Sequence, residues 1–332
     1  MGPLRRDSSL AMRTRWALAG LCLCALTLPV WGARQPAAAT TAAPAAKRFD
    51  SPQAAVDALL DAADKHDVPA LDAIFGPEGE DIVHTGEPAR EKKVAADFVA
   101  KAREKKEIST DPKTPNRAVL VIGAEDWPFP VPLVKSGDQW FFDSKAGLQE
   151  ILYRRIGGNE LDAIQICRGY VEAQDDHAEM KRGNGAVAEY AQRIISTPGK
   201  QDGLAWQNAD GTWGGPIGEN VAKAVAEGYG KGSPYHGYFF KVLKGQGPAA
   251  PLGKMDYVVK GLMIGGFALA AAPADYRVTG VMTFIVSNDG VVYEKDLGPN
   301  TLEEFKKMEL FNPDKTWHPV RAATDEQTAA TE

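Results

Sequence analysis

The chain has 332 residues and a formal net charge of −6, with 44% hydrophobic and 25% charged residues. This composition is typical of packed globular structure and excludes an intrinsically disordered chain. The acidic balance, without any cluster of Lys and Arg, argues against nucleic acid or an anionic membrane surface as a partner.

The first 32 residues are typical of a secretory signal peptide. Arg13 and Arg15 form a basic region, and an apolar run follows from Trp16 to Val30. This run is shorter than the roughly 20 apolar residues that a membrane-spanning helix needs, and Pro29 interrupts it. A signal peptide is therefore favoured over an anchor, with cleavage near Gly32. We expect a periplasmic or secreted protein that keeps no stable membrane anchor after cleavage.

The three cysteines bear on the compartment and on stability. Cys22 and Cys24 each follow a leucine, where the lipidation signal of a lipoprotein needs a small residue, so lipidation is not expected. Both would leave with the signal peptide and only Cys167 would remain. No internal disulfide is then expected, even in an oxidising compartment.

Residues 33–47 predict a disordered linker, because they are rich in Ala, Thr and Pro. An α+β domain is expected over residues 48–156. Its first helix should be capped by Ser51, with Pro52 in the first turn, and apolar residues then recur at helical spacing. A further helix is expected over 89–107, with a buried stripe formed by Val94, Phe98 and Val99.

From Arg117 the pattern changes to strands, namely AVLVIG, WPFPVPLV and QWFFD, and a helix is expected over 146–155. Pro128, Pro130 and Pro132 are spaced two apart, so the backbone side that lacks N–H groups should lie at a sheet edge. A polyproline segment that binds a partner domain is the alternative. Helices followed by a curved antiparallel sheet resemble the cone of nuclear-transport-factor-2-like domains.

A second α+β domain is expected over 157–320, starting at a Gly-Gly pair. Asn159 is placed to cap a new helix, with Glu160 and Asp162 in its first turn, where a helix dipole favours negative charge. The apolar face of that helix should consist of Leu161, Ile164, Cys167 and Val171. Shorter helices are expected over 187–194 and 221–228. Four strands follow, YFFKVL, FALAAAP, GVMTFIVS and VVYEKDL, with an Asn-Asp-Gly turn before the last, and residues 321–332 predict a disordered tail.

Several long motifs resemble a bacterial family known as domain of unknown function 2950. They are WPFPVPLV, NELDAIQICRGYVEAQ, EYAQRI, GLAW, PYHGYFFKVL and FALAAAPADYRVTGVMTFIVSNDGVVYEKDLG, and together they span nearly all of residues 49–320. The resemblance implies no activity, because none is assigned to that family.

The second half is also similar to the globular heads of type IV pilins and pseudopilins. The shared features are an N-E-x-x-A-I helix start, a Gly-Tyr-Phe-Phe strand, an Ala-rich strand ending in Pro, and a Phe-Ile-Val-x-x-Asp-Gly hairpin. The similarity implies one long helix packed across an antiparallel sheet. The chain departs from true pilins because Glu160 lies mid-chain, without the long apolar helix that drives fibre assembly.

The residues that could carry chemistry are few. Cys167 with His236 as a base would make a thiol nucleophile, but Cys167 shares a stripe with apolar residues and is expected in the core. The five histidines are scattered without metal-ligand spacing, so neither a metal nor a cofactor is expected. Nucleophile-elbow, phosphate-loop and dinucleotide motifs are absent from the sequence.

Aromatic residues around His236 are the best candidates for a ligand-binding surface. Tyr235 and Tyr238 flank it, and Trp206 and Trp213 lie in a Gly-rich stretch earlier in the chain. Such side chains can line a site for a sugar or a peptide, or can be buried loop anchors. The leading hypothesis is a non-catalytic binding or assembly module of the cell envelope, with an envelope protein or a cell-wall component as partner. A hydrolase that uses His236 and a carboxylate, in a cleft between the two halves, is the alternative.

Overall fold

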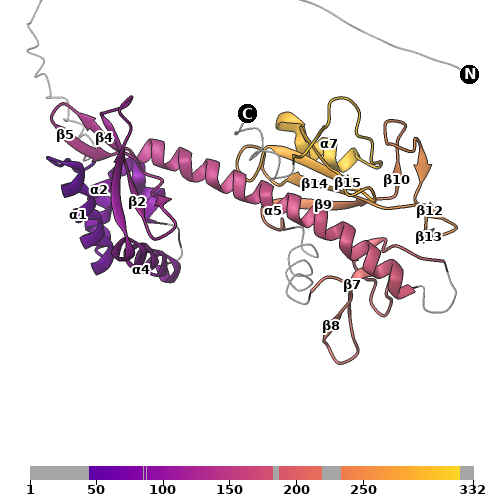
Figure 1. The fold of residues 1–332 in the computed structure, drawn as a ribbon. Coiled ribbons are helices and arrows are strands. Elements are labelled where there is room, and N and C mark those ends of the chain that lie inside the picture. The colour runs from indigo at the N-terminus through magenta and orange to yellow at the C-terminus, as the bar shows by residue number, and fades with distance from the viewer. Residues whose placement is uncertain (1–44, 85, 87, 182–186, 219–232, 322–332) are drawn as a thin grey trace, which may run out of the picture. The chain divides into compact units, whose positions relative to one another are not determined.

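The computed structural model describes residues 45–84, 86, 88–181, 187–218 and 233–321. The predicted signal peptide, most of the linker, the helix expected over 221–228 and nearly all of the tail lie outside these residues. Helices and antiparallel sheets alternate in separate blocks along the chain (Figure 1), so the expected α+β class is confirmed. No helix within the described ranges has both the length and the apolar character needed to cross a membrane.

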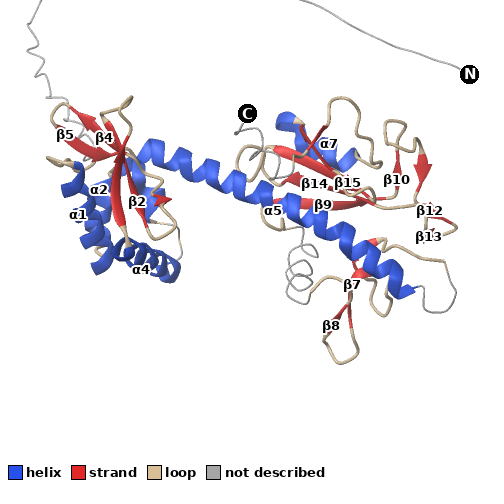
Figure 2. Cartoon of the chain, in the orientation of Figure 1, coloured by secondary structure: helices blue, strands red, loops and turns tan. Residues whose placement is uncertain are grey.

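The first block is a helical layer followed by an antiparallel sheet (Figure 2). The helices are α1 (Pro52–Lys65), α2 (Val68–Phe75), the 3₁₀ turn η1 (Pro77–Gly79), α3 (Glu80–Val83) and α4 (Pro88–Glu104). The strands are β1 (Lys106–Thr110), β2 (Arg117–Ile122), β3 (Trp127–Pro128), β4 (Leu133–Ser136) and β5 (Gln139–Phe142), paired in the order β1-β2-β4-β5 with β3 on β2. The core between the layers includes Val56, Leu59, Ile74, Leu120 and Phe142.

Local signals place α1 correctly. The Ser51 hydroxyl accepts a hydrogen bond from the Ala54 N–H at 3.1 Å, so it caps the helix as expected. The helix ends at His66, whose positive φ of 52° closes the last turn.

Two expectations for this block are wrong. The helix expected over 89–107 ends at Glu104, and the next residues form β1, because Lys106–Thr110 gain a full antiparallel ladder on β2. Val94 was expected in the buried stripe but is 58% exposed, whereas Val99 is buried. The buried residues of α4, Val99 and Ala102, both lie in its C-terminal half.

A single helix, α5 (Ser144–Lys181), replaces the two helices expected on either side of Gly157-Gly158. Two glycines cost only about 1 kcal/mol each in a helix, and α5 packs against η1 and α3 near its start and against strands of the second block farther along. This packing outweighs the local propensity. The boundary expected at 156/157 therefore lies inside a helix, and the independence of the two halves stays a prediction.

The second block contains a five-stranded antiparallel sheet in the order β17-β16-β15-β14-β9. Its strands are β9 (Tyr238–Leu243), β14 (Ala268–Pro273), β15 (Met282–Ser287), β16 (Val292–Asp296) and β17 (His318–Pro319). The first four are the strands expected from the sequence. Small pairs accompany them: β10 (Gly245–Gln246) with β11 (Met255–Asp256), and β12 (Val258–Val259) with β13 (Leu262–Met263). The turn η3 (Gly298–Asn300) leads into α7 (Thr301–Lys307).

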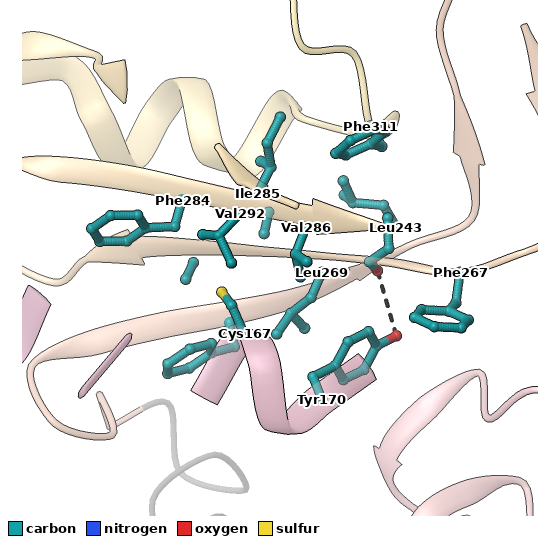
Figure 3. Packing of buried hydrophobic residues seen from close by; sticks show 14 of the residues in the cluster. Cys167, Tyr170, Leu243, Phe267, Leu269, Phe284, Ile285, Val286, Val292 and Phe311 are labelled. Carbon is teal, nitrogen blue, oxygen red and sulfur yellow. Dashed lines mark hydrogen bonds between the residues drawn. The ribbon is translucent and has the colours of Figure 1, made fainter. Parts of the chain in front are cut away.

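Both faces of this sheet are covered, which explains its Ala-rich middle strand. Every residue of β14 is buried, because α5 packs on one face and α7 on the other. Figure 3 shows Cys167 and Tyr170 of α5 on one side of the strands and Phe311 on the other. Small side chains in β14 let the two layers approach the sheet closely.

A third group of strands lies beside α5: β6 (Arg193–Ile195), β7 (Gly203–Gln207) and β8 (Trp213–Gly214). The strand pair β6-β7 is parallel, and β7-β8 is antiparallel. The helix expected over 187–194 is wrong for the described residues, because Tyr190 instead bridges to Met263 and the chain then enters β6. Leu161, expected on the buried face of α5, is 62% exposed.

Candidate functional site

The turn from Tyr235 to Tyr238 is a tight β-turn that opens β9. Tyr235 and Tyr238 exchange backbone hydrogen bonds of 2.9 and 3.0 Å. His236 (φ 48°) and Gly237 (φ 74°) between them both have positive φ, as a type I′ turn requires. A Cβ atom on Gly237 would lie only 2.5 Å from Nδ2 of Asn159, so the turn also presses closely on α5.

Three side chains of α5 hold this end of the sheet, and we call Asn159, Glu160 and Asp162 the latch. Asn159 donates to the carbonyl of Thr279 at 2.8 Å. One carboxylate oxygen of Glu160 accepts the backbone N–H groups at the start of β15, at 2.8 and 3.0 Å. The expected role of these residues as a helix start is therefore wrong, because α5 already runs through them.

The third latch residue reaches the candidate histidine. Oδ2 of Asp162 lies 2.6 Å from Nδ1 of His236, and both side chains are nearly half exposed. A carboxylate on Nδ1 is the arrangement that orients a histidine as a general base. The same contact also holds the turn against α5. The other two latch residues, Asn159 and Glu160, bind backbone groups only, so their role is structural.

Cys167 is not a partner for His236. The cysteine is fully buried in the core of the second block, as expected from its apolar stripe, and burial raises the pKa of its thiol to about 12. A thiol in that state is not a nucleophile near neutral pH.

A pocket of about 330 Å³ lies next to the turn, on the side of α5 that faces β7. Its volume is within the range of small-molecule sites. The ring of Tyr235 belongs to the wall and lies 4.4 Å from the ring of His236, which joins the turn to the pocket. The other apolar lining residues are Ile166, Tyr170, Ala173, Ile194, Leu204, Ile217, Phe240 and Leu269.

The rim of this pocket carries negative charge. Glu172 and Asp176 line it, stand one helical turn apart on α5 and are exposed. Asp175 and Glu179 lie on the same helix without lining the pocket. None of these four carboxylates has an ion-pair partner among the residues that the structure describes.

Buried polar side chains of α5 hold the segments that lie beside the pocket. Gln174 forms hydrogen bonds of 2.7 and 2.8 Å with the backbone N–H and carbonyl of Ala191. The ring nitrogens of His177 lie 2.9 and 3.3 Å from the carbonyl oxygens of Glu189 and Gln201. The segments leading into β6 and β7 are thereby tied to the helix.

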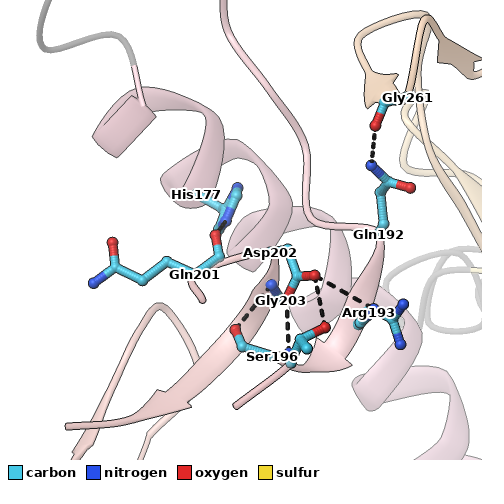
Figure 4. A network of polar contacts seen from close by, with 9 residues as sticks. His177, Gln192, Arg193, Ser196, Gln201, Asp202, Gly203 and Gly261 are labelled. Carbon is cyan, nitrogen blue, oxygen red and sulfur yellow. Dashed lines mark hydrogen bonds and ion pairs between the residues drawn. The ribbon is translucent and has the colours of Figure 1, made fainter. Parts of the chain in front are cut away.

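A second polar network closes the loop between β6 and β7 (Figure 4). The carboxylate of Asp202 accepts the backbone N–H and the hydroxyl of Thr197, at 2.7 and 2.8 Å, and lies 3.5 Å from Nε of Arg193. Gly203 donates its N–H to the Ser196 hydroxyl at 2.9 Å. These contacts position β7, and with it Leu204, at the pocket.

The other aromatic candidates lie elsewhere. Trp206 in β7 and Trp213 in β8 are half-buried in one hairpin, where the indole of Trp206 covers Gly214, and neither lines the pocket. Tyr238 is fully buried and donates its hydroxyl to the carbonyl of Met282 at 2.9 Å. Burial and the nearby charge of Glu160 raise its pKa, which keeps the phenol protonated. Of the five predicted site residues, Tyr235 thus lines the pocket, and His236 lies beside it.

The sequence patterns did not identify the acidic residues beside His236 and at the pocket rim. Asp162 was placed at a helix start, and Glu172 and Asp176 were not singled out. Their spacing of four residues, beside the apolar positions Tyr170 and Ala173, was a usable signal. Within the described parts of the chain, no group of three or more His, Cys, Asp or Glu side chains could hold a metal ion.

Comparison with known proteins gives one finding. No curated protein and no solved structure matches the chain. A family model described as protein of unknown function (DUF2950) matches residues 46–320, which span the whole of both structural blocks. The chain therefore belongs to the DUF2950 family of proteins of unknown function.

Proposed function

We propose that the protein is an exported, non-catalytic binding protein of the cell envelope, and that the apolar pocket beside α5 is its ligand site. The observation that carries this proposal is the pairing of a pocket of about 330 Å³ with two carboxylates at its rim that have no ion-pair partner in the described part of the chain. Apolar walls supply affinity, and a few polar groups supply orientation.

The charge at the rim indicates the class of ligand. An aliphatic or aromatic group that carries an ammonium or guanidinium could enter the pocket with its charge beside Glu172 and Asp176. The rings of Tyr170 and Tyr235 in the wall suit the apolar part of such a ligand. An envelope protein or a cell-wall component that presents a basic group is the partner we infer.

Calorimetric titration with 2-phenylethylamine, and with the uncharged 2-phenylethanol as reference, tests this assignment. We expect the amine to bind more tightly, and the double variant Glu172→Gln/Asp176→Asn to weaken amine binding about five- to tenfold, since each partly exposed ion pair contributes up to about 1 kcal/mol. The matched control is Asp175→Asn/Glu179→Gln, which removes the same charge from the same helix outside the pocket. Equal effects of the two double variants, or equal affinity for amine and alcohol, would contradict the proposed site.

Export rests on the basic and apolar pattern of residues 13–30. N-terminal sequencing of the protein recovered from a bacterial envelope fraction should find a start near Ala33. Recovery of the intact chain from the cytoplasm would refute this part of the proposal.

A hydrolase is the second candidate, and the 2.6 Å contact between Asp162 and His236 is the observation in its favour. The latch contacts of Asn159 and Glu160 favour a structural role for the same contact. A panel of envelope substrates, assayed with the wild type and with His236→Ala, separates the two candidates. A folded His236→Ala protein that has lost a turnover shown by the wild type would establish the enzyme and remove the binding proposal.

A further inference from the structure

The first block contains a larger cavity, of about 800 Å³, that is distinct from the pocket beside α5. Residues of α1, α2, α3, α4, β2 and β3 line it, together with the first turns of α5. Its wall is mainly apolar. The cavity therefore has the size and the lining of a ligand site, and it belongs to no feature used in the proposed function.

Four aromatic side chains form the inner wall. Phe129 is at their centre, with its ring 5.2 Å from Phe98, 6.3 Å from Trp127 and 6.4 Å from Phe75. These rings offer a continuous apolar surface for a chain or a ring of a ligand.

Val94 shows that the described residues leave part of this surface exposed. It belongs to the apolar stripe of α4 with Phe98 and Val99, yet it is 58% exposed and lines the cavity. Trp127, at 36% exposed, also lines it. A ligand that covers large apolar side chains at a cavity wall removes them from water, and this burial favours binding.

The charges at the cavity are biased towards positive. Lys101 and Arg155 line it, are exposed, and have no carboxylate within ion-pair distance in the described part of the chain. Asp97 lines it too, but Lys93 already neutralises that carboxylate at 2.6 Å. Arg90 and Glu91 complete the charged lining and offset one another in formal charge. Lys101 and Arg155 are thus two cations at the cavity that have no ion-pair partner among the described residues.

We propose that this cavity binds a free amphipathic carboxylate, with its hydrocarbon part against the Phe98–Phe129 wall and its anionic group beside Lys101 and Arg155. Charge complementarity selects the anion, as the acidic rim of the other pocket selects a cation. The exposed apolar wall selects a single hydrocarbon chain or an aromatic group. The two sites of the protein therefore take ligands of opposite charge.

Isothermal titration of the full chain with dodecanoate, and with dodecanol and dodecylamine as probes of equal chain length, tests the proposal. We expect dodecanoate to bind at least tenfold more tightly than dodecanol. Lys101→Gln/Arg155→Gln should reduce dodecanoate affinity at least tenfold and leave dodecanol affinity within twofold. Lys92→Gln, on the same helix outside the cavity, should leave both affinities unchanged.

Val94→Asp provides a second arm, because the side chain is already exposed and its replacement should leave the fold intact, as checked by circular dichroism. We expect this variant to abolish dodecanoate binding, and Glu172→Gln in the other pocket to have no effect on it. The proposal is overturned if dodecanoate fails to bind, if it binds no better than dodecanol, or if folded Val94→Asp binds it normally. It is also overturned if Val94→Asp instead dissociates a dimer in sedimentation, which would make a second copy the occupant.

Discussion

Replacing Glu160 by Ala should destabilise the fold by about 2–3 kcal/mol. The carboxylate accepts two backbone N–H groups, of Val281 and Met282, at 2.8 and 3.0 Å. A hydrogen bond to a charged acceptor contributes about 1.5–3 kcal/mol, and because Glu160 is only half-buried, water recovers part of the two bonds in the variant. Glu160→Gln keeps a carbonyl oxygen for the N–H groups and removes the charge, so we expect a loss of about 1 kcal/mol.

Urea denaturation followed by circular dichroism measures this loss. Glu179→Ala is the control, because that glutamate is exposed on the same helix and has no ion-pair partner among the described residues. If Glu160→Ala costs no more than Glu179→Ala, the latch does not hold the sheet and its assignment is wrong.

The charge of Glu160 has a separate readout. Burial, and then the charge of Glu160, raise the pKa of the Glu294 carboxyl on β16. Glu160→Gln should therefore lower the pKa of Glu294, as followed by NMR titration of its side-chain carbon. An unchanged pKa would show that the two carboxylates do not interact.

Three further predictions concern the turn, the β6–β7 loop and the core thiol. In urea denaturation, Gly237→Ala should lower the free energy of unfolding by about 1–2 kcal/mol more than Gly290→Ala does. Both glycines have φ near 75°, but only a Cβ at 237 meets Asn159. Equal losses of stability would refute the close approach. Burial alone would raise the pKa of Asp202, but hydrogen bonds from Thr197 and the charge of Arg193 outweigh it and lower the pKa. A carboxyl with a lowered folded-state pKa stabilises the fold above its unfolded value near 4 and loses that contribution as pH falls through the folded value. The difference in unfolding free energy between wild type and Asp202→Asn, about 1–2 kcal/mol at pH 7, should thus shrink as pH falls below about 4. A difference independent of pH would contradict this. Cys167 is buried, and burial raises the pKa of its thiol to about 12. In the native chain that begins at Ala33, it should not react with Ellman's reagent at pH 8, and it should react once guanidinium unfolds the protein. Rapid reaction of the native protein would place the thiol outside the core.

Local patterns were sufficient for the elements that pack in the usual way. Ser51-Pro52 predicted the start of α1, and short apolar runs predicted β9, β14, β15 and β16. The Asn-Asp-Gly turn before β16 was equally clear. In each of these segments the local preference and the tertiary environment agree.

Expectations failed where packing from distant residues overrode local preference. Gly157-Gly158 indicated a break, but contacts at both ends keep α5 continuous. Val94 has the spacing of a buried residue, yet it lines a cavity and is 58% exposed.

The sequence by itself determined the family and the α+β class, and it proposed five aromatic and histidine site residues of which Tyr235 and His236 are two. Only the tertiary structure decided what lies next to them, because Asp162 is 74 residues from its partner His236 and the two meet only when the turn before β9 lies against α5. The same holds for both pockets, whose walls join strands and helices far apart in the chain. The spacing of residues along the chain shows which side chains share a face of one helix or strand. A binding site forms where the faces of several such elements pack together, and the spacing within one element does not determine this packing.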